Sequence, residues 1–367
     1  MKQYSIAVIP GDGIGNEVMV DALRVLDRVA EMHGGISFMY EHYEWGCEYY
    51  TRTGNMMAED GMDRIRQSDA ILLGAVGYPG VPDHISLRDL LLRIRQGFNQ
   101  YVNLRPIRLI TEEDCPIKGM GPDDIDMVFV RENSEGEYAG VGGITREGTA
   151  EETALQTSIF TRKNTEKLMD YAFNLARARL DERRHAGRKT VGKVTSATKS
   201  NALNYGMVFW DKLFAERSRL FPDINTDQYH VDALSMYMVQ RPADFDVVVA
   251  SNLFGDILTD LGSVLQGGIG FAAGGNINPD RVFPSMFEPV HGSAPDIAWK
   301  GLANPIAMIW TVKMMLDFLG HPEMGAAVFS AIESVVHNRR AELTPDMGGT
   351  GSTSHTTDLV LQALSAS

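Results

Sequence analysis

The sequence predicts an α/β protein in which much of the sheet is parallel. Apolar runs of strand length, such as residues 70–74 and 247–250, are typical of strands that are buried on both faces. Segments with helical spacing of apolar residues separate these runs. Strands that alternate with helices favour parallel pairing, because the chain must cross over between parallel neighbours.

The N-terminal part combines a strand, a glycine turn and a helix. We expect the strand at 5–9, the turn at 10–15 and an amphipathic helix over 18–29. The glycines are spaced G-x-G-x-G, whereas dinucleotide-binding folds carry G-x-G-x-x-G. A nucleotide loop and a purely structural turn are therefore equally open here.

Further elements follow from the same two periods of apolar residues. They are strands at 126–130, 190–195 and 247–250, helices at 87–98, 162–179 and 303–319, and glycine-containing loops at 77–82 and 267–275. Polar residues stand directly after several strands, and Asp232 follows the short run 228–231.

One stretch, residues 251–260, places two acids close together. We expect a turn at 252–255 and then a helix, with Asp256 and Asp260 four residues apart on one face and about 5–6 Å between their Cβ atoms. Such a pair can bind a hard cation such as Mg²⁺ or Mn²⁺. Alternatively, the pair is solvated at a helix start, where the macrodipole favours acids. Spacing alone favours the solvated pair.

Composition limits the classes of function. The chain of 367 residues is 44% hydrophobic and 22% charged, which is ordinary for a soluble globular protein with room for two domains. Its net charge of −14 argues against non-specific nucleic-acid binding, so an acidic substrate must meet a local cluster of arginines. Cys47 and Cys115 make no disulfide framework.

Targeting signals are not evident in the sequence. The N-terminus runs straight into a strand without the apolar region of a signal peptide, and no apolar run has membrane-spanning length. We expect a cytoplasmic protein with no membrane partner.

Three arginines are candidate substrate ligands: Arg131 stands at the end of a predicted strand, and Arg95 and Arg105 lie in an otherwise apolar region. Guanidinium groups bind carboxylates through two parallel hydrogen bonds, so three of them suggest a small di- or tricarboxylic acid. Taken singly, each is more often a surface charge. Tyr138 alone is more often a packing residue, and Lys199 can act as a base only if its surroundings lower its pKa.

Six motifs occur together and in order, at 9–15, 103–106, 130–133 with Tyr138, 194–199, 251–260 and 288–296. With them the chain resembles, over nearly its whole length, the β-decarboxylating dehydrogenases of metal-bound 2-hydroxy acids, which include isopropylmalate, isocitrate, D-malate and tartrate dehydrogenases. The resemblance implies a two-domain, three-layer α/β/α fold with a large mixed sheet, and not a conventional Rossmann fold. It implies a cofactor-side domain of residues 1–103 and 257–367, a central domain of 104–256 that carries the dimer contacts, and a substrate cleft between them.

The resemblance also implies roles for single residues. Arg95, Arg105 and Arg131 match the arginines that bind the malate carboxylates, Tyr138 the acid, and Lys199, from the partner subunit, the base. Mg²⁺ or Mn²⁺ would be held by Asp256 and Asp260 with Asp232 of the partner subunit, which implies a homodimer with shared active sites. The choice of metal, a need for K⁺ and assembly beyond the dimer are open.

The cofactor implied by the resemblance is NAD. The matching positions are Glu288, His291, Gly292, Ser293, Ala294, Asp296 and Asn304. Asp296 stands where NAD enzymes of the family carry an acid for the adenosine ribose hydroxyls. Because that carboxylate would repel a 2′-phosphate, we expect NAD and not NADP.

Substrate choice depends on the helix that precedes Arg95. Asp89 would repel a third carboxylate and so disfavours isocitrate, while Leu91 and Leu92 could form an apolar pocket for isopropylmalate. Arg88 stands where isopropylmalate enzymes commonly carry an acid and several D-malate enzymes a tryptophan. The flanking stretches are most similar to D-malate and tartrate dehydrogenases. We expect oxidative decarboxylation of D-malate to pyruvate and CO₂, or tartrate oxidation, with 3-isopropylmalate dehydrogenase as the alternative and a non-catalytic, metabolite-sensing homologue as a less favoured one.

Overall fold

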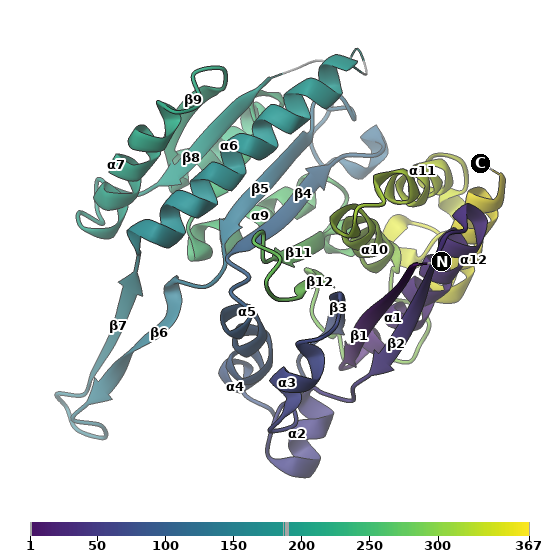
Figure 1. Ribbon diagram of the computed structural model, residues 1–367, viewed down its shortest axis with the longest axis horizontal. Helices are drawn as coiled ribbons and strands as arrows, with labels where there is room; N and C mark the ends of the chain where they lie inside the picture. Colours follow the sequence, from purple (N-terminus) through teal and green to yellow (C-terminus); the bar gives the residue numbers. More distant parts are fainter. Residues whose placement is uncertain (1, 186, 188–190, 367) are drawn as a thin grey trace. The chain divides into compact units, whose positions relative to one another are not determined.

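The computed structural model describes residues 2–185, 187 and 191–366. They divide into two compact units. Unit 1 contains the residues up to 100, 109–122 and those from 263 onward, and unit 2 contains 101–108 and 123–262. Each unit combines helices with a mixed sheet, which confirms the predicted α/β fold class (Figure 1).

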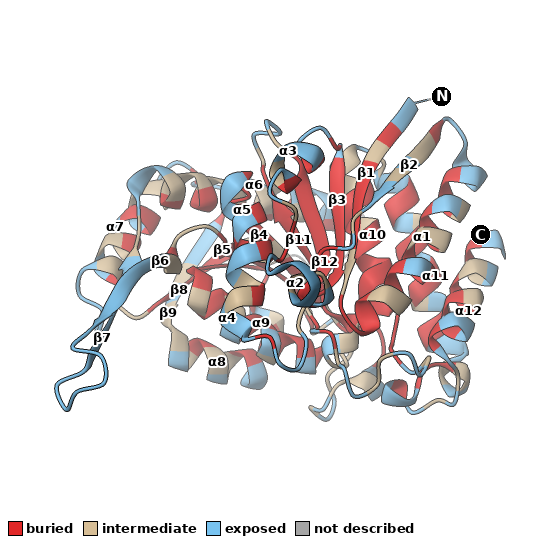
Figure 2. Ribbon diagram, turned by 90° about the horizontal axis from the view of Figure 1, so that it is seen from below, coloured by how far each residue is buried: buried red, intermediate tan, exposed pale blue. Residues whose placement is uncertain are grey.

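In unit 1 the strands run in the order β2-β1-β3-β12-β11. All neighbours are parallel except β11 and β12, which are antiparallel. The bounds of the strands are β1 (Lys2–Gly11), β2 (Ile36–His42), β3 (Ala70–Ala75), β11 (Ala273–Ile277) and β12 (Ser285–Pro289). Strand β3 is buried along its whole length, as its apolar run predicts (Figure 2).

Helices of unit 1 pack against these strands or against each other. They are α1 (Ile14–His33), α2 (Cys47–Thr53), α3 (Gly61–Ile65), α4 (Asp83–Ser86), the π-helix η1 (Leu87–Leu92), α5 (Arg93–Gly97), α10 (Ile306–Leu319), α11 (Pro322–Asn338) and α12 (Thr353–Ala366). Short 3₁₀ turns are η2 (Glu112–Asp114), η4 (Ile269–Phe271), η5 (Arg340–Glu342) and η6 (Pro345–Met347).

In unit 2 the strands run in the order β4-β5-β10-β8-β9. Strands β4 and β5 are antiparallel and the other neighbours are parallel. The bounds are β4 (Val102–Arg108), β5 (Asp126–Glu132), β8 (Lys193–Thr198), β9 (Asn225–His230) and β10 (Val247–Ala250), with helices α6 (Arg162–His185), α7 (Gly206–Ser218), α8 (Val231–Gln240) and α9 (Asn252–Leu265) and the 3₁₀ turn η3 (Pro242–Asp244).

A separate two-stranded sheet, β6 (Gly136–Thr145) with β7 (Thr153–Ile159), extends from the body of unit 2 (Figures 1 and 2). Its residues beyond position 139 are almost all exposed. The sequence does not predict this hairpin, because its Gly- and Thr-rich strands carry no apolar alternation.

Several predicted boundaries need correction. The expected turn at 252–255 is wrong, because α9 already begins at Asn252 and the Gly255 amide donates to the Ser251 carbonyl at 2.8 Å. The strand expected at 190–195 begins at Lys193, and Thr190 lies outside the described residues. The helix expected over 87–98 is π-helical in its first half.

Among the described residues, no helix combines the length and apolar character that crossing a membrane would require.

Candidate active site

In unit 2, three predicted site residues meet on the carboxylate of Asp256, in the second turn of α9. The Arg131 Nη1 atom lies 2.7 Å from Asp256 Oδ1, and the Arg105 Nη2 atom lies 3.4 Å from the same oxygen. The Tyr138 hydroxyl donates to Asp256 Oδ2 at 2.9 Å. Since these side chains come from β5, β4 and β6, the fold of unit 2 itself assembles this group.

Arg131, only 1% exposed, is held by the start of α9. Its Nε donates to the Asn252 carbonyl at 2.8 Å and its Nη2 to Asn252 Oδ1 at 2.7 Å. The Tyr138 ring lies 5.7 Å from the guanidinium carbon, within reach of a cation–π interaction. A buried guanidinium is stable only when paired and hydrogen-bonded, as it is here.

Gly255 gives the stem of Arg131 its room. A Cβ atom at position 255 would lie 2.5 Å from Arg131 Cγ. The sequence pattern predicts this glycine in a turn, whereas the structure requires it as a helical residue in close contact with an arginine.

Arg105 is held by a residue that the sequence analysis missed. Its Nη1 donates to Thr259 Oγ1 at 2.6 Å, and the Thr259 hydroxyl donates to the Gly255 carbonyl at 2.8 Å. Thr259 and Asn252 both lie within the 251–260 motif, on the helix that carries the two aspartates. Their polar side chains in an apolar helix were the available signal.

Asp260, the second predicted metal ligand, is exposed on α9, four residues after Asp256. Partial burial raises the pKa of its carboxyl; Arg105 opposes this rise and Asp256 adds to it. Among the described residues no three His, Cys, Asp or Glu side chains gather as a metal site. Because Mg²⁺ typically takes one or two carboxylates plus water and substrate oxygens, the pair on α9 nevertheless fits such an ion.

Lys199 and Asp232 form a second group in unit 2. Lys199 follows β8 and Asp232 begins α8, and the lysine Nζ donates to Asp232 Oδ1 at 2.7 Å. The Lys199 hydrogen bond lowers the pKa of the Asp232 carboxyl. Within the described residues Asp232 joins no acid cluster with Asp256 and Asp260.

In unit 1, Arg95 is buried in α5 and paired with Glu288 at the end of β12. The Arg95 Nη2 atom lies 2.5 Å from Glu288 Oε1, which also accepts a hydrogen bond from Asn276 Nδ2 at 2.7 Å. The Nε atom of Arg95 is buried without a hydrogen-bond partner. Glu288, a predicted cofactor residue, therefore fixes a predicted substrate arginine.

The loop after β12 carries further predicted cofactor residues. Burial lowers the pKa of His291, so the imidazole is neutral near pH 7, and its Nδ1 lies 3.0 Å from the Gly292 carbonyl. Nε2 of His291 is buried without a partner. Gly292 faces open space, and Asp296 is exposed. These positions leave polar groups available to a ligand.

The glycine turn at 10–15 supports this loop from inside. The Ile14 amide donates to the Ser293 carbonyl at 2.9 Å, and a Cβ atom on Gly13 would lie 2.2 Å from that oxygen. A Cβ on Gly11 would lie 1.9 Å from the Ala75 carbonyl oxygen. The protein's own backbone thus requires these glycines, which favours the structural interpretation of the turn.

Two predicted positions have a local structural role. Ala294 adopts a left-handed φ of 39°, uncommon for a residue with a side chain. Asn304 Oδ1 accepts the Ile306 amide at 3.0 Å, and its Nδ2 donates to Asp346 at 2.9 Å. Asn304 therefore satisfies the first amide of α10, whose N-cap position is Pro305.

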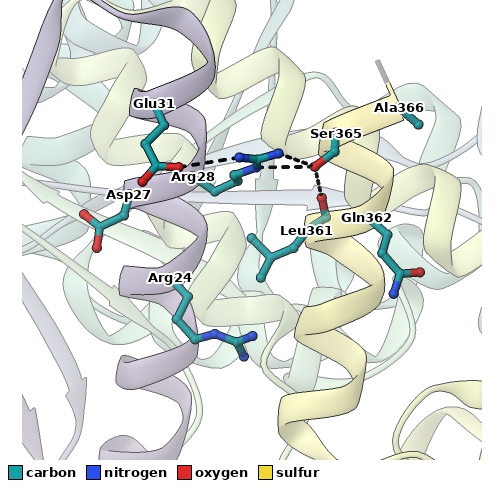
Figure 3. Close-up of a pocket in the computed structure, with 8 residues that line it drawn as sticks. All are labelled: Arg24, Asp27, Arg28, Glu31, Leu361, Gln362, Ser365 and Ala366. Carbon is teal, nitrogen blue, oxygen red and sulfur yellow. Dashed lines mark hydrogen bonds and ion pairs between the residues drawn. The ribbon is translucent and has the colours of Figure 1, made fainter.

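A different cavity, of about 680 Å³, lies between α1 and α12 (Figure 3). Arg28 donates to Ser365 Oγ at 2.9 Å and approaches Glu31 at 3.5 Å, while Arg24 pairs with Asp21 and Asp358. No predicted site residue lines it, and its arginines already have partners.

Comparison with known proteins gives a consistent result. Residues 5–361 match the family described as isocitrate/isopropylmalate dehydrogenase. A probable tartrate dehydrogenase/decarboxylase of Bacillus subtilis (strain 168) is 49% identical over 99% of both chains. The D-malate dehydrogenase [decarboxylating] of Escherichia coli (strain K12) is 48% identical, also over 99% of both chains.

Solved structures agree with the sequence relatives. The crystal structure of isocitrate dehydrogenase from Methylococcus capsulatus matches with a TM-score of 0.84 and 33% identity, over 98% of this chain and 99% of that one. With the grouped arginines, tyrosine and aspartates described above, these matches show that the chain belongs to the isocitrate/isopropylmalate dehydrogenase family and is an oxidatively decarboxylating dehydrogenase.

Proposed function

We propose that the protein catalyses metal- and NAD-dependent oxidative decarboxylation of a small 2-hydroxy dicarboxylic acid, D-malate or tartrate. The observation that carries the proposal is the convergence of Arg131, Arg105 and Tyr138 on Asp256. Such a group combines carboxylate binding, a proton donor and a cation ligand. The names of the relatives, tartrate dehydrogenase/decarboxylase and D-malate dehydrogenase, support the substrate class.

Each residue in the proposal has one task. Arg95, Arg105 and Arg131 bind the substrate carboxylates through charged hydrogen bonds. Lys199 accepts the proton of the C2 hydroxyl as that carbon loses its hydride. Tyr138, a neutral donor in the structure, protonates C3 after CO₂ leaves.

Asp256 and Asp260 would hold Mg²⁺ or Mn²⁺, joined by the partner subunit's Asp232. When bound, such an ion supplies Lewis-acid polarisation of substrate oxygens. Removal of metal with a chelator should abolish NADH production from the acid, and added Mg²⁺ or Mn²⁺ should restore it. Full turnover in the chelated protein would contradict the metal requirement.

The loop 291–296 supports NAD as the cofactor. The neutral His291 offers a buried, unpartnered Nε2 as a hydrogen-bond acceptor, and Asp296 offers an exposed carboxylate that disfavours a 2′-phosphate. Measuring kcat/KM with NAD and with NADP tests the assignment, which a clear NADP preference would overturn.

A second candidate substrate is 3-isopropylmalate. Leu91 and Leu92 both lie in η1, close in sequence to Arg95; Leu92 is buried and Leu91 packs against the hydrophobic core of unit 1. The aliphatic character of this turn keeps an apolar substituent as a candidate. Comparing kcat/KM on D-malate, L-tartrate, meso-tartrate and 3-isopropylmalate decides between them. A strong preference for isopropylmalate would overturn the choice of D-malate or tartrate. Absence of turnover on all of them would overturn this substrate class and point to another 2-hydroxy acid.

A homodimer with shared active sites completes the proposal. The proposed chemistry needs Lys199 and Asp232 beside Asp256. Within the described residues of one chain, Asp232 forms no acid cluster with Asp256, so we propose that a second chain supplies Asp232 and Lys199. Met236 and Ile257 expose about half of their surface on α8 and α9, at 46% and 58%, an apolar area that a second copy can cover. A cytoplasmic location stays a prediction of the sequence.

A further inference from the structure

Glu132, the last residue of β5, has its carboxylate completely enclosed, with 1% of the residue exposed. Burial raises the pKa of Glu132, while the surrounding hydrogen-bond donors oppose that rise. An ionised carboxylate in such a position is stable only because N–H and O–H groups point at it. Its neighbour Arg131 is the arginine that the proposed function assigns to the substrate.

The two oxygens of Glu132 have different partners. Oε1 accepts hydrogen bonds from the Ser134 amide and hydroxyl, the Glu135 amide and Asn164 Nδ2, at 2.8 to 3.0 Å. Oε2 accepts from the Glu135 amide at 2.9 Å and from Asn252 Nδ2 at 3.3 Å. One oxygen therefore orders the turn after β5, and the other reaches α9.

Asn252 connects this carboxylate to Arg131. Its Nδ2 donates to Glu132 Oε2 and to the Glu135 carbonyl, each at 3.3 Å. Its Oδ1 accepts from Arg131 Nη2 at 2.7 Å. A carboxamide has one donor end and one acceptor end, so an acceptor on the Glu132 side obliges the oxygen to face Arg131. Glu132 thus sets which end of the amide meets the arginine.

The same turn leads to the strand of Tyr138. Gly136 adopts a φ of 67°, and a Cβ there would lie 3.3 Å from Asn252 Cβ. The amide of Asn252 and the ordered turn therefore pack closely together.

We propose that Glu132 is a positioning residue which, through the side chain of Asn252, holds Arg131 in the orientation that binds a substrate carboxylate. The inference rests on the proposed function in so far as Arg131 contacts the substrate.

A donor–acceptor exchange tests the proposal. In Glu132→Gln, the amide oxygen should keep the site of Oε1, which has more donors, so its NH₂ group faces Asn252. Asn252 must then flip and present NH₂ to Arg131, donor against donor. In Asn252→Asp, two carboxylates face each other. In the double variant, the new amide at position 132 donates to the new carboxylate at position 252, whose second oxygen accepts from Arg131.

We expect each single variant to raise KM for the hydroxy acid by about 10- to 100-fold, because a buried hydrogen bond is replaced by a repulsive contact. KM for NAD should stay within about twofold of the wild type. The double variant should recover a clear part of the loss, but not all of it, because the new carboxylate at position 252 faces the Glu135 carbonyl to which the Asn252 amide donated. Losses that multiply in the double variant, or an equal rise in KM for NAD, would overturn the proposal.

Asn164→Ala is the matched control. Asn164 also donates to Glu132, at 2.9 Å, but to the oxygen that faces away from Asn252. The control should lower the unfolding midpoint and leave KM for the hydroxy acid unchanged. An increase in KM equal to that of Glu132→Gln would show a merely structural role for the carboxylate.

Failure of the proposed function and failure of the positioning role of Glu132 can be distinguished. The measurement is the free energy of unfolding of the wild type, the two single variants and the double variant. If the wild type oxidises none of the hydroxy acids, the proposed function fails, and the cycle is then read from urea unfolding alone. Recovered stability in the double variant still supports the hydrogen-bond relay, and additive losses overturn it.

Discussion

Lys199 and Lys193 stand at opposite ends of β8, and each pairs with an aspartate at 2.7 Å. Of these two lysines only Lys199 is proposed to act chemically. It follows the carboxyl end of β8, and the site residues of unit 2 lie at that end of the strands. Lys193 packs over the Phe245 ring at 5.4 Å, a structural environment.

We predict that Lys199→Met lowers kcat by about 10²- to 10⁴-fold, the usual contribution of a general base. The unfolding midpoint and dimer mass should stay unchanged, as measured by thermal denaturation and light scattering. The matched variant Lys193→Met should lower stability and keep kcat. Unchanged turnover in Lys199→Met would mean that another group is the base.

The glycine turn between β1 and α1 supports the loop after β12. Gly13 has a φ of 55° and its added Cβ would lie 2.2 Å from the Ser293 carbonyl oxygen. Gly34, at the end of α1, has a similar φ of 67° but open space around it. Adding a Cβ at Gly34 therefore tests backbone strain alone, whereas adding one at Gly13 tests strain together with a steric clash against the Ser293 carbonyl.

We predict that Gly34→Ala costs about 1–3 kcal/mol, for backbone strain alone, because its φ of 67° with a ψ of −179° is a conformation that essentially only glycine adopts. Gly13→Ala should cost more and should also raise KM for NAD, because it displaces the loop of His291 and Asp296. Urea unfolding and NAD titrations measure the two effects. Equal stability losses and an unchanged KM for NAD would show that this loop is independent of the turn.

Ion pairs hold helix α6 against the strands of unit 2. Arg179 and Arg183 on the helix each pair with Asp126 and with the fully buried Asp246. Burial raises the pKa of Asp126, but the coulombic effects of the two arginines prevail and lower it to about 2. A carboxyl with a depressed pKa stabilises the fold above the unfolded-state pKa near 4, and this contribution is lost as the pH falls toward 2.

We predict that unit 2 loses about 2 kcal/mol of stability between pH 5 and pH 2 through this carboxyl. In Asp126→Asn this component of the acid destabilisation should be absent. Trp210 is buried in unit 2 and the other three tryptophans lie in unit 1, so fluorescence of a variant that keeps only Trp210 reports urea unfolding of unit 2 across the pH range. Asp223→Asn is the control: Arg177 also lowers the pKa of Asp223, but this pair is exposed and screened by water, so the substitution should change the acid profile much less than Asp126→Asn.

The sequence predicted those elements whose burial is uniform. Strand β10 matches its apolar run residue for residue, and β3 nearly so. The β6–β7 hairpin was missed because its residues are exposed and give no alternating pattern. The π-helical turn η1 could not be predicted, because residue propensities do not distinguish π-helical from α-helical winding; packing in the folded protein decides between them.

The site residues of unit 2 can be recognised in the sequence as parts of motifs, but the contacts between them cannot be predicted from it. The spacing of Asp256 and Asp260 suggests a pair, but only the fold shows that Arg131, Arg105 and Tyr138 meet one of them. Asn252 and Thr259 were read as turn and helix residues. Their partners lie more than a hundred positions away in sequence, beyond the reach of local patterns.

The proposed homodimer predicts complementation between inactive chains. Lys199→Met and Asp256→Asn should each be inactive alone. If Lys199 acts in the partner's site, random pairing makes half of the dimers mixed, each with one intact site of two, so about a quarter of wild-type activity should return.

A mixture of Lys199→Met with Asp232→Asn is the control. Both residues would be contributed by the same chain, so no mixed dimer contains a complete site, and activity should stay absent. Activity measured after co-refolding equimolar chains tests both mixtures. Recovery in the control mixture, or none in the first, would contradict sharing of sites across the dimer.

The wide turn η1 gives the segment before Arg95 a property that an ordinary helix lacks. A π-helix contains about 4.4 residues per turn and is equivalent to an α-helix with one inserted residue. Removing one residue from Leu87–Leu92 should restore regular winding, with Arg95 still anchored by Glu288. The upstream residues would then rotate by about 100° about the axis. A single codon deletion can thus present a new set of side chains to the substrate without rebuilding the scaffold.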